Sequence, residues 1–76
     1  MKKVAWKSLR VGEPFYYYGC EGFAVKINEV ELMILDNINW YGWHFVPGQV
    51  LDAADICCTL YRLSEQFQKE FGIDLG

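Results

Sequence analysis

The sequence lacks the residue patterns on which most metal and enzyme sites depend. Its cysteine and histidine ligands are Cys20, His44, Cys57 and Cys58, and no Cys-x-x-Cys spacing brings two of them together. A tetrahedral zinc site needs four converging ligands, so we expect no metal. Glycine-rich phosphate loops and paired carboxylates are missing as well. We therefore expect no cofactor and no catalytic residue.

Cysteine is also too scarce and too irregular for a disulfide-bonded secreted protein. The count of three is odd, and Cys57 and Cys58 are adjacent, a spacing at which an ordinary disulfide is strained. Reduced thiols are the expectation. One alternative remains open: Cys20 lies in a glycine-flanked turn, and His44 as its base would make a small thiol enzyme. We favour the interpretation of both as ordinary turn and strand residues.

Basic residues are a minority, and long apolar runs are missing. Seven Lys and Arg against ten Asp and Glu give a formal net charge of -3, which disfavours direct nucleic-acid binding. No apolar run is long enough for a signal peptide or a membrane span, so we expect a cytoplasmic protein without membrane contact. The basic residues near the start are interrupted by Val4 and Trp6. They are Lys2, Lys3, Lys7 and Arg10.

Hydrophobic residues, in contrast, make up 53% of the chain and aromatic residues 17%. A chain of 76 residues forms one small domain, residues 1–76, which buries only about 60% of the surface that its unfolded form exposes. Large rings compensate for this, since each can bury roughly 150 to 250 Å².

Short alternating segments separated by turn residues predict strands over residues 15–18, 23–27, 30–35 and 40–46. The turns between them are rich in glycine, asparagine and aspartate, and Pro47-Gly48 ends the last strand. We therefore predict a meander of three or four antiparallel strands.

The rest of the chain predicts one helix over residues 52–72, with Asp52 as N-cap and Gly72 as C-cap. Its apolar residues recur at helical spacing and are Ile56, Leu60, Leu63, Phe67 and Phe71. The predicted fold class is thus α+β, a three- to four-stranded antiparallel sheet with one long C-terminal helix packed across one face. A rival interpretation makes residues 56–63 a fifth strand, followed by a short helix from Ser64, in a small barrel.

Strand alternation divides the predicted sheet into two faces. One would face the helix with Phe23, Val25, Ile27, Val30, Leu32 and Ile34. The opposite face would carry Lys26, Met33, Tyr16, Tyr18, Trp40 and His44. Tyrosine and tryptophan anchor many protein interfaces, so we predict a partner-binding face there. Its four central residues are Tyr16, Tyr18, Trp40 and His44. Acidic residues at its turns would engage basic groups of the partner. They are Glu29, Glu31 and Asp36.

Two further hypotheses concern leftover surface. A flank of the predicted helix, made of Ala54, Cys57, Cys58 and Tyr61, is a candidate self-association face, so we expect a monomer or a homodimer. Alternatively, the sheet aromatics with Lys26 would form a stacking platform for single-stranded nucleic acid.

Leu9-Arg10-Val11-Gly12-Glu13-Pro14-Phe15, followed by Tyr18-Gly19, Phe23 and Val25-Lys26-Ile27, resembles the opening of many very small bacteriophage proteins. The resemblance covers roughly the first 35 residues, and its hairpin pattern has low specificity. It implies a small-barrel fold and a phage-type accessory protein. Such proteins are similar to inhibitors that occlude a host defence complex, anti-CRISPR proteins among them. The implied function is a protein-binding module that inhibits or regulates a larger protein or ribonucleoprotein complex.

Overall fold

The computed structural model describes residues 2–17, 22–40, 42–55 and 59–64. Within these ranges the chain forms eight short strands and two 3-10 helices. In chain order the elements are β1 (Lys2–Val4), η1 (Trp6–Ser8), β2 (Pro14–Tyr17), β3 (Gly22–Lys26), β4 (Glu31–Ile34), β5 (Ile38–Trp40), β6 (Trp43–Phe45), β7 (Val50–Asp52), η2 (Ala53–Asp55) and β8 (Leu60–Arg62).

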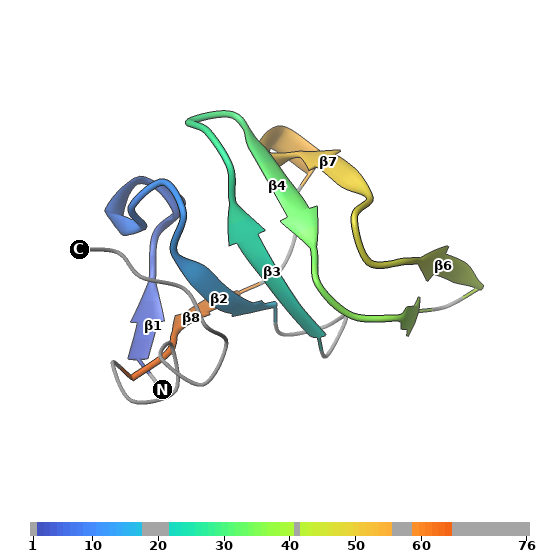
Figure 1. Ribbon diagram of the computed structural model, residues 1–76. Coiled ribbons are helices and arrows are strands. Elements are labelled where there is room, and N and C mark those ends of the chain that lie inside the picture. Colours follow the sequence, from blue (N-terminus) through green and yellow to red (C-terminus); the bar gives the residue numbers. More distant parts are fainter. Residues whose placement is uncertain (1, 18–21, 41, 56–58, 65–76) are drawn as a thin grey trace.

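Six of these strands form one antiparallel sheet in the order β1-β8-β2-β3-β4-β7 (Figure 1). β8 comes last in the chain but lies between β1 and β2, where Arg62 pairs with both Lys2 and Phe15. β5 and β6 form a separate two-stranded hairpin that projects beyond β4 (Figure 1).

Alternation along the strands gives the sheet a buried inner face and a more open outer face. Residues paired across antiparallel strands share a face, so Phe15, Ala24 and Ile34 lie on the same side. The buried inner-face residues are Phe15, Tyr17, Ala24, Lys26, Leu32, Ile34 and Leu60. η1 and the segment after it add Leu9, 3% exposed, and Trp6, whose ring packs edge-on against Phe15 at 6.0 Å.

The prediction of a long C-terminal helix is wrong, and so is the α+β class. Residues 60–62 form β8, and the structure describes no helix longer than the three-residue η1 and η2. The rest of the predicted helix, residues 56–58 and 65–72, lies outside the described residues. β8 pairs with β2 on the side away from β3. In this position Leu60 and Arg62 lie on the inner face of the sheet, where Leu60 is buried. The rival interpretation of residues 56–63 as a strand is therefore right at residues 60–62.

Two further strand predictions are corrected. The strand predicted over residues 40–46 is split into β5 and β6, with Gly42 at a φ of +86° in the turn between them. The two faces are also assigned differently. Leu32 and Ile34 do face inward, but their partners on β3 are Lys26 and Ala24, so Phe23 and Val25 lie on the outer face.

Candidate binding surface

The β5–β6 hairpin is anchored to the sheet at its base. Ile38 is only 2% exposed and packs where Gly22 has no side chain. A Cβ atom at Gly22 would overlap Ile38 Cδ1 and Cγ1, so glycine is needed for this close approach. Asp36, just before the hairpin, accepts a hydrogen bond from the Phe23 backbone N–H at 3.1 Å. These contacts fix the position of the hairpin relative to β3.

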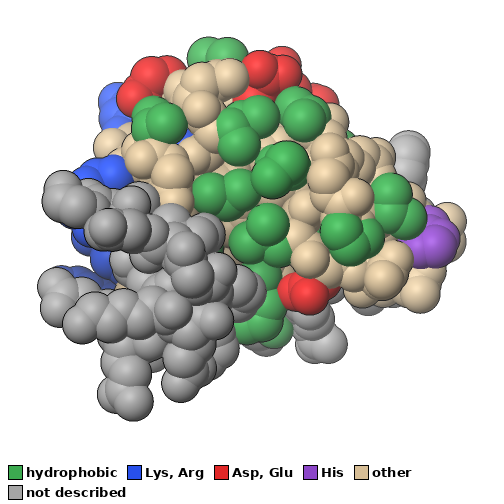
Figure 2. All heavy atoms as spheres, in the orientation of Figure 1, with side chains coloured by type: hydrophobic (Ala, Val, Ile, Leu, Met, Phe, Trp, Pro, Cys, Tyr) green, Lys and Arg blue, Asp and Glu red, His purple; other side chains and the backbone are tan. Residues whose placement is uncertain are grey.

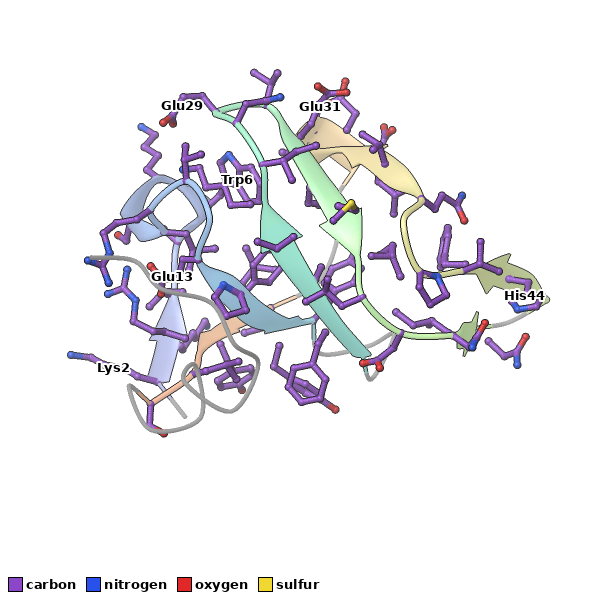
Figure 3. The ribbon with its side chains drawn as sticks, viewed as in Figure 1. Lys2, Trp6, Glu13, Glu29, Glu31 and His44 are labelled. Atoms are coloured by element: carbon purple, nitrogen blue, oxygen red, sulfur yellow. The ribbon has the colours of Figure 1, made fainter. Side chains whose placement is uncertain are left out.

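Two polar residues of the hairpin, in contrast, are exposed. Asn39 and His44 pair across the two strands, and both are exposed. Trp40 and Trp43 form the last pair before the turn, and Figure 3 shows His44 at the end of the molecule farthest from β1. The described part of the hairpin thus combines a buried base at Ile38 with exposed polar side chains at Asn39 and His44.

Gly22→Ala is expected to destabilise the protein by about 1 to 3 kcal/mol, because the new methyl group overlaps Ile38 and the hairpin must shift. Urea unfolding followed by tryptophan fluorescence measures this loss. Adding Ile38→Ala removes the two overlapping carbon atoms, so the double variant should lose less stability than the sum of the two single variants. If the stability losses of the two single variants simply added in the double variant, the overlap with Ile38 would not be the cause of the Gly22→Ala loss.

Charge is distributed unevenly over the molecule. Figure 2 shows most acidic side chains along the top of the view and Lys and Arg along the left, next to the acidic group at the upper left, with apolar side chains over the middle. Glu31 on β4 and Asp52 on β7 are cross-strand partners on the outer face, beside the pair of Met33 and Val50. Val50 is 46% exposed. The β4–β7 end therefore combines exposed apolar surface with negative charge.

Lys26 is buried, although its charge predicted an exposed position. Its side chain is 1% exposed, and its ammonium group donates to the backbone oxygens of Leu9 at 2.8 Å and Trp6 at 3.2 Å. It also lies 3.3 Å from the Glu29 carboxylate and 4.9 Å from the centre of the Trp6 ring. The prediction of an exposed Lys26 that serves a nucleic-acid platform is therefore wrong, because its ammonium group is buried and bound to oxygen atoms of the protein itself.

A second buried charge, Glu13, lies near the same end of the core. It is fully buried, and one carboxylate oxygen accepts from Arg62 Nε at 2.7 Å while the other accepts from the Arg10 backbone N–H at 3.0 Å. Arg62 also donates to the backbone oxygen of Ser8. Together with Lys26, these groups fasten residues 6–13 onto the sheet. We name Glu13, Lys26 and Arg62 the polar cluster and assign it a structural role.

The predicted contact residues lie in separate places. Tyr16 is half-buried on the outer face of β2, where its ring packs against Phe23 at 5.3 Å and Tyr61 at 6.5 Å. Trp40 and His44 belong to the projecting hairpin. The acidic Glu29, Glu31 and Asp36 lie at the β3–β4 turn, on β4 and at the hairpin base; Figure 3 shows Glu29 and Glu31 together at one end. Tyr18 lies outside the described residues.

Only some of the remaining predicted residues lie in the described part of the chain. Ala54 is exposed and lies in η2, which follows the edge strand β7, whereas Tyr61 lies in β8, next to the other edge strand, β1. Cys20, Cys57 and Cys58 lie outside the described residues, so the thiol hypothesis stays a prediction. In the described part of the chain, no group of three or more His, Cys, Asp or Glu could hold a metal ion.

Sequence reasoning missed Asn39 and the edge residues Val50 and Asp52. Asn39 could have been found from Gly42, because a glycine inside a predicted strand can mark an interruption of that strand. β7 gave no signal, because Asp52 matched a helix N-cap.

None of the helices in the described part of the chain has the length and apolar character needed to cross a membrane. Comparisons with family models, curated proteins and solved structures found no match.

Proposed function

We propose that the chain is a small protein-binding module that inhibits or regulates a larger partner, with the β5–β6 hairpin as its principal contact. The observation that carries this proposal is the form of the hairpin: fixed at its base by Ile38, and solvent-exposed at Asn39 and His44. A preorganised projection can enter a cleft of a partner at a small entropic cost.

The composition of the hairpin supports the same function. The segment from Trp40 to His44 reads Trp-Tyr-Gly-Trp-His, and tryptophan and tyrosine dominate the energetics of protein interfaces. The acidic end formed by Glu31 and Asp52 favours a partner with basic groups. Within this proposal the partner is a cytoplasmic protein or ribonucleoprotein complex, and the resemblance to small phage proteins makes a host defence complex our proposed target.

A pull-down with tagged protein from nuclease-treated bacterial lysate tests the proposal. We expect one large complex to be recovered near stoichiometry, and we expect Trp40→Ala and His44→Ala each to weaken its recovery at least about tenfold, as interface hot spots do. Lys7→Ala is the matched control, because Lys7 is exposed on η1, far along the chain from the hairpin.

The circular dichroism of every variant must match that of the wild-type protein, so that a lost partner reports lost contacts. Recovery of the same partner by the hairpin variants would contradict the proposal. Recovery that depends on nucleic acid, or that is lost on alkylation of Cys20, would favour the alternatives of nucleic-acid binding or thiol chemistry.

A further inference from the structure

Among the described residues, the six-stranded sheet has an edge strand at each end of its order, and these two edge strands carry opposite charge. β1 forms one edge with Lys2 and Lys3, which are both exposed. β7 forms the other edge with Val50 and Asp52, which are exposed as well. An open edge strand offers unpaired backbone groups to another strand.

The hydrogen-bond pattern shows which backbone groups of β7 point away from the sheet. Ile34 N–H donates to the Gln49 oxygen at 2.9 Å, and Ala53 N–H donates to the Val30 oxygen at 2.8 Å. In an antiparallel pair, alternate residues bond to the same neighbour. Residues 49, 51 and 53 therefore face β4, and the backbone groups of Val50 and Asp52 face outward.

The same reasoning across the sheet gives the free groups of β1. Lys26 N–H donates to the Glu13 oxygen at 3.1 Å, so residues 13, 15 and 17 face β3 and Tyr16 faces β8, opposite Tyr61. Residues 60 and 62 of β8 then face β1, where they meet Val4 and Lys2. The backbone groups of Lys3 are left facing outward.

The side chains at these outward positions complement each other. Glu31 and Asp52 are direct cross-strand partners, an arrangement of like charges that is unfavourable. Glu31 accepts a hydrogen bond from Asn28 and Asp52 one from the Ala54 backbone, but these bonds leave both charges in place. A cation on a strand beside β7 would relieve the repulsion. Lys3 lies on the outer face like Asp52, because it pairs with Tyr61.

We propose that β7 of one copy of this chain pairs antiparallel with β1 of a second copy, in the register that sets Asp52 opposite Lys3. This register also sets Leu51 opposite Val4, and both are half-buried apolar residues of the inner face. In this arrangement Asp52 and Lys3 point their backbone groups at each other, lie on the same face of the sheet and carry opposite charges. The inference goes beyond the proposed function and requires no other partner.

Charge also selects against the pairing of identical edges. Two β1 strands would bring their lysines together, and two β7 strands would bring two Glu31–Asp52 pairs together. The favoured contact therefore joins different surfaces of the two copies. Such a contact leaves one edge free at each end, so it builds open chains rather than a closed dimer.

Sedimentation velocity of the purified chain tests this inference, from about 10 μM to about 1 mM protein, a range that spans weak associations. We expect the mean mass to rise continuously past that of a dimer and to fall when salt is added, because exposed charges are screened. Lys3→Glu alone and Asp52→Lys alone should each weaken association at least about tenfold, since each sets like charges opposite each other.

Two combinations of these variants make the test specific. A mixture of the Lys3→Glu chain with the Asp52→Lys chain should associate, because each junction again joins opposite charges, and the double variant should associate like the wild type. A wild-type protein that stays monomeric, a mass that stops at the dimer, or association unaffected by the single changes would overturn the proposal. Partner recovery in the pull-down is measured separately, so the two proposals fail independently.

Discussion

Glu13→Ala is expected to lower the free energy of unfolding by about 2 to 4 kcal/mol, less than for a fully buried ion pair, because Arg62 is 36% exposed and can bind water. Glu13 is fully buried, and its carboxylate holds Arg62 Nε at 2.7 Å and the Arg10 backbone N–H at 3.0 Å. Without it, the Arg62 guanidinium keeps only the Ser8 backbone oxygen among its described partners. A loss this large is a substantial part of the stability of a small domain.

Urea denaturation followed by circular dichroism measures the effect. Glu29→Ala is the matched control, because the Glu29 side chain is 79% exposed and its ion pair with Lys26 contributes at most about 1 kcal/mol. Glu13→Gln should fall between the wild type and Glu13→Ala, since an amide oxygen can still accept one hydrogen bond. Equal losses of unfolding free energy for Glu13→Ala and Glu29→Ala would contradict the structural role that we assign to Glu13.

Lys26→Met is expected to lower the free energy of unfolding by about 2 to 4 kcal/mol, although methionine keeps most of the buried volume. The backbone oxygen of Leu9 loses its donor at 2.8 Å, the one at Trp6 loses a second donor at 3.2 Å, and the Trp6 ring loses its cation. The cost of leaving the Leu9 oxygen without this donor outweighs the gain from burying an apolar side chain.

The readout for Lys26→Met is hydrogen exchange together with urea denaturation. Faster exchange should be concentrated in residues 6–13, because Lys26 ties this segment to β3. Lys7→Met provides the control: Lys7 is exposed, and its replacement should change stability by less than about 0.5 kcal/mol. A Lys26→Met protein as stable as this control would show that the ammonium group is dispensable.

The β2–β3 hairpin could be predicted because its information is local. Phe15 and Val25 lie in alternating segments, and the glycines between them mark a turn, so both strands agree with the structure within one residue. The inward position of Lys26 could not be predicted in this way. Its acceptors are 17 and 20 residues distant in the sequence, and only the folded chain brings them together.

The error at β8 has a similar cause. Leu60 and Leu63 fit a helical spacing, but residues 60–63 also alternate, with Leu60 and Arg62 inward and Tyr61 on the outer face. The arrangement that the structure adopts depends on Glu13, which lies 49 residues before Arg62. Periodicity in a short apolar segment does not distinguish helix from strand, and the pairing of β8 with β1 and β2 is a long-range contact that such a pattern does not reveal.

The candidate site was predictable only in part. Aromatic residue types directed attention to Trp40 and His44, and both belong to the projecting hairpin. Tyr16 was placed on the same predicted face, but its ring packs against Phe23 and Tyr61 on the main sheet. Assigning one face to all four central residues assumed a single continuous sheet, whereas the turn at Gly42 creates a second one.

Hydrogen exchange on the complex recovered in the pull-down tests the central claim most directly. If the hairpin is the principal contact, amide protection on binding should be greatest in residues 38–45, while residues 15–17 of β2 should stay unchanged. Protection confined to the outer face of β2 and β3, with no change in residues 38–45, would contradict the account.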